Sequence, residues 1–439
     1  MSSMLDKSLN STTLYLKEFI KGLWRDRSSA KRINTFSQKQ FLDTINNAYH
    51  NVPFYKKFWD DHQIDIKQIK SLKDINLLPI LTKTLIKKHF IDHSILQTNF
   101  NPNQGVQMNT TGSTGTPLSV ILNPKTYARY ITTYIRYYIR LGYYPWDVVS
   151  YVKTESLNLP HIGPFFQLKY IDHFKDLATI FNEIKKNKTS ILMIYPWTAM
   201  KLTQNYDETQ LKALKLKFIV LNSEISTKQD RIYLAKVFNC PVYDEFSCNE
   251  TFLIAMHCKN FNYHIPTDSI WLEAVDKKNQ PVTKGQSGNL LITTLNSPAM
   301  PLIRYQLDDV IELSDEFCTC KSPYPIIKSF SGRVDDMFIM PDGREIPAIS
   351  LMILMKKAVP ESPKSIKTFK LIQLEPLLIK FQIVPGVNFK KEQLDGFELQ
   401  LQEFCNAPIK LIIEEVKNIE YSTFKHKMIE SHCTLKKNT

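Results

Sequence analysis

Short apolar runs alternate with segments of helical period between residues 108 and 315, and this alternation constrains the fold more than any other feature. The runs with the length and composition of strands are residues 118–122, 148–152, 190–195, 218–221 and 241–243. Further strands at 269–275 and 288–294 are consistent with a smaller β-rich subdomain. Segments in which apolar side chains have helical spacing, such as residues 228–237, lie between some of these strand-like runs. The pattern predicts an α/β fold in which helices cover a sheet and loops at the strand ends carry the chemistry.

Regions of different character flank this segment. Residues 14–24 and 37–59 have the spacing of amphipathic helices, the second one broken at Pro53. After Gly332 we expect a hairpin turned at residues 341–343, and then the following elements: helices near 350–358 and 390–405, and strands at 368–374, 378–384 and 409–416. The sequence therefore predicts a helical region at 1–100, an α/β and β-rich core at 101–333, and a small, mobile C-terminal α+β domain at 334–439.

Composition excludes several classes of protein. With 43% hydrophobic and 23% charged residues among 439, the chain can bury large cores, so a disordered or collagen-like chain is excluded. Seven cysteines make a poor disulfide framework, and their odd number argues further against one. The amino terminus has no secretory pattern, and no run reaches the ~18 to 20 apolar residues of a spanning helix. We therefore expect a cytoplasmic protein without a transmembrane segment.

The net charge of +13 predicts a preference for anionic partners. Nucleic acid is not expected among them, because the sequence lacks the interleaved aromatic and basic residues that are typical of known RNA- or DNA-binding modules. Arg25, Arg27, Lys31 and Arg32 directly follow the first amphipathic segment. This segment is either a helix on a membrane surface or a helix packed on the main body beside solvated charges, and the second arrangement is favoured.

The run TTGSTGTP at residues 110–117 predicts a phosphate-binding loop. Gly112 and Gly115 allow a tight turn and a close approach of the backbone to a ligand. Hydroxyl groups that can bind phosphate oxygens come from Thr110, Thr111, Ser113, Thr114 and Thr116. A Walker A loop is excluded because no Gly-Lys-Ser/Thr follows. An ordinary turn is the alternative, but the chain has only 12 glycines and places two of them here.

Five motifs in a fixed order resemble the adenylate-forming superfamily, whose members join a carboxylic acid to ATP and then pass the acyl group to a thiol. The loop is the first motif. Residues 222–224, Asn-Ser-Glu, stand where a Gly-Gly-Glu turn is usual, and residues 246–250, Phe-Ser-Cys-Asn-Glu, stand where the superfamily has Tyr-Gly-x-Thr-Glu. Residues 304–309, Arg-Tyr-Gln-Leu-Asp-Asp, resemble Arg-Tyr-x-x-Gly-Asp, and residues 332–336 resemble the Gly-Arg-x-Asp-Asp hinge.

Two further segments resemble one branch of the superfamily, that of the phenylacetate–coenzyme A ligases and the CapK-like capsule-biosynthesis proteins. Residues 52–55, Val-Pro-Phe-Tyr, match a segment near the start of that branch. Residues 318–320, Cys-Thr-Cys, precede the hinge motif as the branch's Cys-x-Cys does. The resemblance covers nearly the whole chain.

The resemblance implies a role for each matching residue. ATP would contact the loop at 110–116 and also Ser223, Glu224, Glu245, Phe246, Asp309 and Arg333. Asp309 would accept hydrogen bonds from the ribose, and Arg333 would contact ribose or phosphate. Glu250 would hold Mg²⁺, and Lys425, with Lys427 as the alternative, would neutralise charge during the attack on the α-phosphate. Glu250 and Lys425 are thus the expected catalytic residues.

The implied reaction is an ATP-dependent adenylation of a small carboxylic acid, followed by acyl transfer to a thiol. Coenzyme A is the acceptor expected from the branch, and an acidic acyl carrier protein is the alternative, which the charge of +13 would attract. A homodimer is the oligomer considered. The alternative from another class is a basic anion-binding protein that kept the fold without the chemistry. Asn222, Ser223 and Asp308 stand at positions where the superfamily has glycine, which is compatible with that alternative.

The acid itself is not specified by the sequence. Side chains at strand ends facing the loop are the candidates for its pocket, namely Tyr151, His161, Phe165, Tyr195 and Trp197. Their aromatic character hints at an apolar or aromatic acid, although each could equally belong to the core.

Three cysteines and one histidine predict a structural zinc site. Cys258 and His264 form one pair, and Cys318 and Cys320 form the other. Three thiolates and one imidazole suit a closed tetrahedral site if two hairpins meet. Cys248 and His257 are alternative ligands, and four unrelated residues are the alternative to any site.

Overall fold

The computed structural model describes residues 2–109, 118–154, 156, 165–314, 316–333, 337–358, 366–419 and 428–433. Its helices are α1 (Ser2–Asp26), α2 (Ala30–Asn51), α3 (Pro53–Asp61), α4 (Lys83–Ile91), α5 (Pro124–Leu141), α6 (Leu177–Lys186), α7 (Pro196–Asn205), α8 (Glu208–Lys212), α9 (Lys228–Phe238), α10 (Ala348–Ala358) and α11 (Phe397–Cys405). No helix in these ranges is both long enough and apolar enough to cross a membrane.

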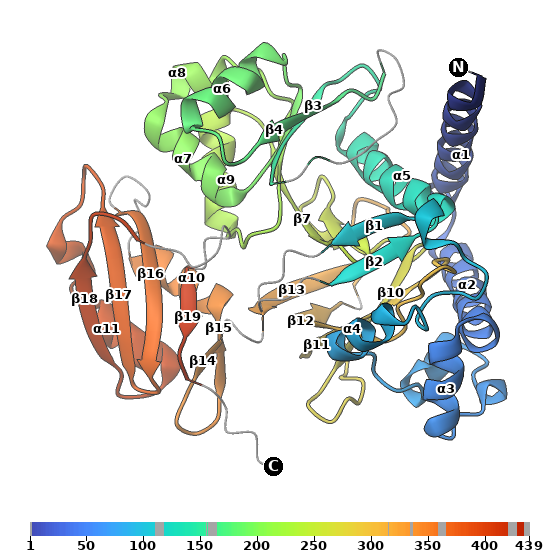
Figure 1. Ribbon diagram of the computed structural model, residues 1–439. Coiled ribbons are helices and arrows are strands. Elements are labelled where there is room, and N and C mark those ends of the chain that lie inside the picture. Colours follow the sequence, from blue (N-terminus) through green and yellow to red (C-terminus); the bar gives the residue numbers. More distant parts are fainter. Residues whose placement is uncertain are drawn as a thin grey trace.

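One eleven-stranded sheet runs through the larger part of the molecule (Figure 1). Its strands are β3 (Val149–Lys153), β4 (Leu168–Asp172), β5 (Ile191–Ile194), β6 (Phe218–Leu221), β7 (Val242–Cys248), β8 (Phe252–His257), β9 (Tyr263–His264), β10 (Ile270–Val275), β11 (Ser287–Thr294), β12 (Tyr305–Leu313) and β13 (Ile326–Arg333). Their spatial order is β10-β11-β12-β13-β9-β8-β7-β6-β5-β3-β4.

The sheet has a parallel half and an antiparallel half that meet at β7. Strands β4, β3, β5, β6 and β7 pair in parallel, and β7 pairs antiparallel with β8. The remaining strands up to β10 pair antiparallel. The strands predicted at 269–275 and 288–294 therefore extend this same sheet. The α/β class is confirmed, with one mixed sheet as its frame.

A separate hairpin carries the predicted phosphate loop. Strands β1 (Val106–Asn109) and β2 (Ser119–Leu122) pair antiparallel, and Asn109 lies opposite Ser119. Residues 110–118 connect these two positions, and the structure of residues 110–117 lies outside the described residues. The loop thus begins and ends on paired strands, which fixes where its two ends lie.

The carboxyl-terminal part has its own sheet and core. Strands β18 (Lys410–Glu415), β17 (Leu378–Pro385), β16 (Ile366–Glu375) and β19 (Ile429–Ser431) pair in that order, and β14 (Met337–Ile339) and β15 (Glu345–Pro347) form the expected hairpin. Buried side chains of α10 and α11 pack with this sheet in one apolar cluster. The helix predicted at 390–405 is shorter: a 3₁₀ turn at Lys391–Leu394 precedes α11, and Gly396 between them has a φ of +78°, which a continuous helix does not allow.

The amino-terminal helices pack against the antiparallel half of the sheet. α2 and α3 contribute Phe41, Tyr55 and Trp59 to a buried apolar cluster that also contains Tyr305. Pro53 is the first residue of α3, a position where its missing N–H costs no hydrogen bond. The predicted break at this proline is thus confirmed as the boundary between two helices. α1 lies along α5 at the edge of the molecule (Figure 1).

Candidate functional site

Polar side chains gather where the parallel strands end. Lys153 is the last residue of β3, Tyr195 follows β5, Asn222 follows β6, and Glu245 lies one residue beyond the stretch of β7 that pairs with β6. Because parallel strands share one carboxyl edge, these residues meet although up to 92 positions separate them in the sequence. This edge is where open α/β sheets bind ligands.

Lys153 joins the turn at residues 222–224. Its Nζ donates hydrogen bonds to Asn222 Oδ1 at 2.5 Å and to Ser223 Oγ at 2.8 Å. The same ammonium lies 4.9 Å from the centre of the Tyr195 ring. Ser223 has a φ of +65°, in the left-handed region that glycine adopts most easily. The turn thus retains this backbone conformation although serine replaces the glycine that the superfamily usually has here. Glu224 closes the turn, because its Oε2 accepts a hydrogen bond from the backbone N–H of Trp197 at 3.0 Å.

Glu245 is buried beside this turn. Burial raises the pKa of its carboxyl group to about 7, and the nearby Lys153 ammonium and the Ser247 hydroxyl act in the opposite direction. Ser247 Oγ donates to Glu245 Oε1 at 3.2 Å. Within the described residues, neither Glu245 Oε2 nor Asn222 Nδ2 has a hydrogen-bond partner. Buried polar atoms of this kind are normally satisfied by water or by a ligand.

Glu250 lies where three of the sequence motifs meet. Its Oε1 accepts a hydrogen bond from the Tyr305 hydroxyl at 3.1 Å, and the residue is buried. The preceding Asn249 donates from Nδ2 to the backbone carbonyl of Asn109 at 2.6 Å. Asn109 is the residue directly before the phosphate loop. The structure thus brings the start of the loop, the carboxylate of Glu250 and the motif at 304–309 to one place.

Asp309 and Arg333 also come together. They lie opposite each other on β12 and β13, so the fourth and fifth candidate motifs share one strand pair. Arg304, in contrast, is a structural residue: its Nε donates to the Glu273 carboxylate at 3.1 Å, and its Nη1 donates to the Leu78 carbonyl at 2.6 Å. It is buried, so this arginine anchors the strand that presents Asp309.

Several predicted site residues lie outside the described residues. They are the loop Thr110–Thr116, His161, Lys425 and Lys427. Of the predicted acid-pocket residues that are described, Tyr151 and Tyr195 are buried at the carboxyl edge, Trp197 is half-buried, and Phe165 is 48% exposed. Phe246 packs edge-on against Phe330, with 4.8 Å between ring centres.

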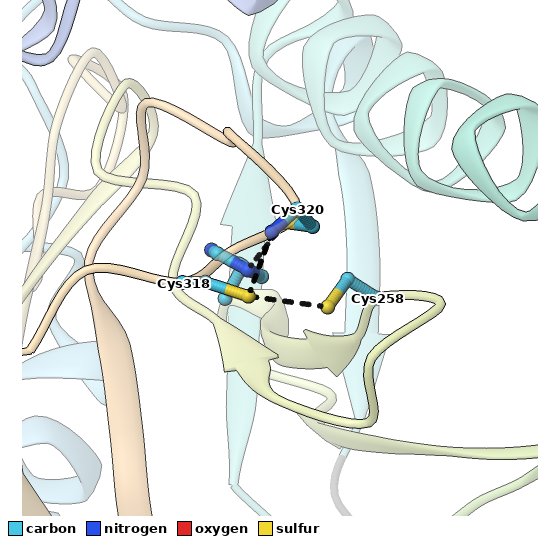
Figure 2. A group of neighbouring side chains, drawn as sticks. Cys258, Cys318 and Cys320 are labelled. Carbon is cyan, nitrogen blue, oxygen red and sulfur yellow. Dashed lines mark hydrogen bonds between the residues drawn. The ribbon is translucent and has the colours of Figure 1, made fainter.

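The predicted zinc ligands form one cluster (Figure 2). The ligand atoms of Cys258, His264, Cys318 and Cys320 all lie within 4.8 Å of one another. Cys258 Sγ and Cys318 Sγ are 3.7 Å apart, and Cys320 Sγ lies 3.2 Å from His264 Nε2. A tetrahedral site with Zn–S distances of ~2.3 Å requires a separation of about 3.8 Å between sulfurs. The two loops that follow β8 and β12 therefore meet as the sequence predicted, with spacing that suits a metal.

The surroundings of the cluster orient its ligands. The Nδ1 atom of His264 lies 2.8 Å from the carbonyl of Tyr324, which accepts a hydrogen bond when Nδ1 carries the proton. Burial lowers the pKa of His264 to about 4, so the ring is neutral and Nε2 keeps its lone pair. Asn262 Nδ2 donates to Cys318 Sγ at 3.3 Å. A surface cavity of ≈ 290 Å³, lined by Arg140 and Lys259 among others, reaches Cys258, His264 and Cys320 and provides access.

The alternative zinc ligands lie elsewhere. Cys248 contacts the Thr251 hydroxyl at 3.2 Å, and His257 accepts the backbone N–H of Asp244 at Nδ1. Both side chains thus have other partners. Neither belongs to the four-residue cluster.

Sequence reasoning missed Lys153, Asn249 and Tyr305. Lys153 could have been found as the single cation at the end of a buried strand. Asn249 and Tyr305 lie inside motifs that the sequence singled out, but their partners are 140 and 55 residues away. Contacts over such separations follow from the sheet order, which the sequence pattern did not supply.

Comparison with known proteins finds similarity to acid–coenzyme A ligases and to protein CapK. No family model matches it. It is 21% identical over 346 residues to phenylacetate-coenzyme A ligase of Thermus thermophilus, covering 75% of this chain and 76% of that protein. It is 23% identical over 338 residues to phenylacetate-coenzyme A ligase of Escherichia coli, which covers 72% of this chain and 74% of that protein. It is 22% identical over 337 residues to protein CapK of Staphylococcus aureus, which covers 73% of this chain and 72% of that protein.

Solved structures share the fold. The crystal structure of 2-hydroxyisobutyryl-CoA ligase in its postadenylation state matches with a TM-score of 0.76 at 17% identity, covering 93% of this chain and 91% of that one. The same ligase in its thioesterification state, in complex with the acyl adenylate and CoA, matches with a TM-score of 0.62 at 17% identity. This match again covers 93% of this chain and 91% of that one. The resemblance to the adenylate-forming superfamily, and to its phenylacetate–coenzyme A ligase and CapK branch, is confirmed.

Proposed function

We propose, from this relationship to adenylate-forming ligases, that the protein activates a carboxylic acid with ATP and transfers the acyl group to the thiol of coenzyme A. One observation carries the proposal: the bonds Asn249–Asn109 and Tyr305–Glu250 bring three separately placed motifs to one point. A chain that had kept only the fold would have no need to hold the loop start, a buried carboxylate and the 304–309 motif together.

In the first step the substrate carboxylate oxygen would attack the α-phosphorus of ATP. A new P–O bond forms while the bond to pyrophosphate breaks, and the electron pair leaves with pyrophosphate. The loop at 110–116 would hold the phosphates, Asp309 and Arg333 would fix the ribose side, and Glu250 would hold Mg²⁺. Mg²⁺ would neutralise part of the negative charge on the phosphates. Lys425, with Lys427 as the alternative, would balance the charge that develops on the carboxylate and the α-phosphate.

In the second step the acceptor thiol would release its proton to water and attack the acyl carbon as a thiolate, and AMP would leave with the electron pair of the C–O bond. We infer that the module of residues 334–439 turns about the hinge motif near residues 335–336 between the two steps. The better match to the postadenylation state than to the thioesterification state of 2-hydroxyisobutyryl-CoA ligase supports an arrangement suited to the first step. An acidic acyl carrier protein is the alternative acceptor, which a chain of +13 charge would attract.

Pyrophosphate exchange tests this function directly. Incubation of the protein with ATP, Mg²⁺, labelled pyrophosphate and a panel of carboxylic acids should give acid-dependent exchange into ATP. Adding coenzyme A, or separately an acyl carrier protein, should then convert the active acid to a thioester with only one of the two. Absence of exchange over the whole panel, together with absence of ATP binding, would favour a basic protein that kept the fold without chemistry.

Glu245, which the resemblance assigns to the ATP site, is proposed here to face the acid instead, and the acid that fits the carboxyl edge bears a polar group in its tail. Lys153 brings an ammonium group to this edge beside Asn222 and Glu245, whose Nδ2 and Oε2 atoms are buried without partners among the described residues. A plain aromatic tail would leave these atoms unsatisfied at a cost of ~1 to 3 kcal/mol each. A hydroxyl, amino or amide group would satisfy them. The aromatic rings of Tyr151 and Tyr195 would pack against the rest of the acid.

Replacing Lys153 by methionine is expected to raise KM for the acid at least ~10-fold, because one charge-assisted hydrogen bond is worth ~1.5 to 3 kcal/mol. KM for ATP should change less than about threefold. The measurement is pyrophosphate exchange against acid and ATP concentration. Lys169→Met is the matched control, since Lys169 lies on the adjacent strand β4 and is exposed. Equal effects on both KM values would remove Lys153 from acid recognition.

We also propose that the cluster of Cys258, His264, Cys318 and Cys320 holds a structural zinc ion. Its support is the 3.7 Å separation of two sulfurs, the neutral imidazole and the hydrogen bonds that orient the ligands. The ion would join the β8–β9 hairpin to the β12–β13 connection. It would thereby brace the strands that carry Asp309 and Arg333.

A further inference from the structure

The first helix has one face that is fixed to the body of the protein. Glu18 pairs with Arg129 of α5 at 3.2 Å, and Asp26 pairs with Arg136 of α5 at 2.5 Å. Arg25 pairs with the fully buried Asp268 at 2.6 Å. Buried ion pairs of this kind are costly to break, because each partner would be left as an uncompensated charge. The orientation of α1 about its own axis is therefore set.

The opposite face of α1 exposes large apolar side chains. Leu16, Ile20 and Trp24 are 56%, 45% and 75% exposed. They recur every four residues, so they form one stripe about 12 Å long at the helical rise of ~1.5 Å per residue. Three large apolar side chains in a row on a rigid helix differ from the singly scattered exposed residues that need no explanation.

The charges around this stripe have one sign. Lys17, Lys21 and Arg27 are exposed beside it, and Lys31 and Arg32 are exposed at the start of α2. The acidic residues of the segment 12–27 are Glu18 and Asp26, and both pair with arginines of α5. The outer face of α1 thus combines an apolar stripe with a cationic border.

We propose that this outer face docks on an anionic lipid bilayer. Apolar side chains would enter the boundary between head groups and acyl chains, while the lysines and arginines would meet anionic head groups. Trp24 suits this depth, since indole rings favour the interface between water and lipid. A second copy of the chain is disfavoured as the occupant, because two such faces would bring like charges together.

The arrangement allows a flat surface to reach the stripe. Figure 1 shows α1 at the edge of the molecule, away from the carboxyl-terminal sheet. The ion pairs keep the stripe turned outward when α1 touches the surface. Docking therefore requires no unfolding of α1 from α5.

Vesicle flotation with the full-length protein tests the proposal. Binding is expected to vesicles of phosphatidylcholine with 30% phosphatidylglycerol at low salt, and it should fall at least tenfold in 0.5 M NaCl or with phosphatidylcholine alone. The double variant Ile20→Ser/Trp24→Ser and the double variant Lys17→Glu/Arg27→Glu should each lower the bound fraction at least tenfold. Trp146→Ser is the matched control, because Trp146 is 63% exposed and belongs to another part of the surface.

Thermal unfolding of each variant should match that of the wild type, since the replaced side chains are exposed. Absence of binding to the anionic vesicles, or binding that the two double variants leave unchanged, would overturn the proposal. So would a stable complex with an acidic acyl carrier protein that depends on the same residues while the vesicles are ignored, because that result assigns the face to a protein. Pyrophosphate exchange without lipid is independent of these outcomes and reports on the ligase function separately.

Discussion

Glu250→Gln is expected to lower acid-dependent pyrophosphate exchange at least ~100-fold. The substitution removes the negative charge that would hold Mg²⁺ at the phosphates, and loss of one such electrostatic contact in a buried site costs ~10² to 10³ in rate. The amide oxygen of glutamine can still accept the Tyr305 hydroxyl, so the fold should remain. Exchange rate and melting temperature, measured on the same preparation, separate the two effects.

Tyr305→Phe is the control within the site. It removes the hydroxyl that donates to Glu250 at 3.1 Å but keeps the carboxylate. Its exchange rate should fall less than about tenfold. Glu312→Gln, near the far end of the same strand, changes a half-buried carboxylate that pairs with Lys328 at 2.9 Å, and it should leave exchange unchanged. Wild-type exchange in Glu250→Gln, with Mg²⁺ dependence also unchanged, would move the metal-binding role to another residue.

Purified protein is expected to contain about one zinc ion per chain, and Cys320→Ser is expected to lose it. A closed site of three thiolates and one imidazole binds zinc tightly, and the binding free energy becomes folding free energy. The melting temperature of Cys320→Ser should therefore fall by at least ~5 °C, given that 1 kcal/mol shifts it by ~2 to 4 °C in domains of this size. Metal analysis and thermal unfolding are the two measurements.

Two other cysteines provide matched controls for the zinc prediction. Cys433 lies on the carboxyl-terminal part, and Cys248 of the 246–250 motif contacts the Thr251 hydroxyl. Cys433→Ser and Cys248→Ser should both retain zinc at the wild-type stoichiometry. Prolonged chelation of the wild type should reproduce the lowered melting temperature of Cys320→Ser. A wild-type protein purified without any zinc, and insensitive to added zinc, would contradict the prediction.

Periodicity located many elements because their signals are local. Strand β6 was predicted at its observed bounds, and α9 within one residue. The helix α5 was not predicted, since its tyrosines, isoleucines and threonines have modest helix propensity. Its ends nevertheless carry clear signals: Asn123 caps it, Pro124 is its first residue, and Gly142 follows it with a φ of +110°.

The candidate site was predictable only in part. The grouping of Cys258, His264, Cys318 and Cys320 was predicted from their ligand chemistry and is confirmed, whereas the zinc ion itself stays a prediction. The role of Arg304 did not follow, since its partners Glu273 and Leu78 come from distant segments and fix it as an anchor. The Lys153 contact with the 222–224 turn depends on strand order in space, which the sequence alone left open.

The junction at β7 has a consequence for how the protein opens. Strand β7 is hydrogen-bonded to β6 in the parallel half of the sheet and to β8 in the antiparallel half, so the two halves are joined through one strand. Neither half can separate from the other without breaking hydrogen bonds of a buried strand. Amide hydrogens of β6, β7 and β8 should therefore exchange with solvent together, as one cooperative unit, and later than those of β16 and β17.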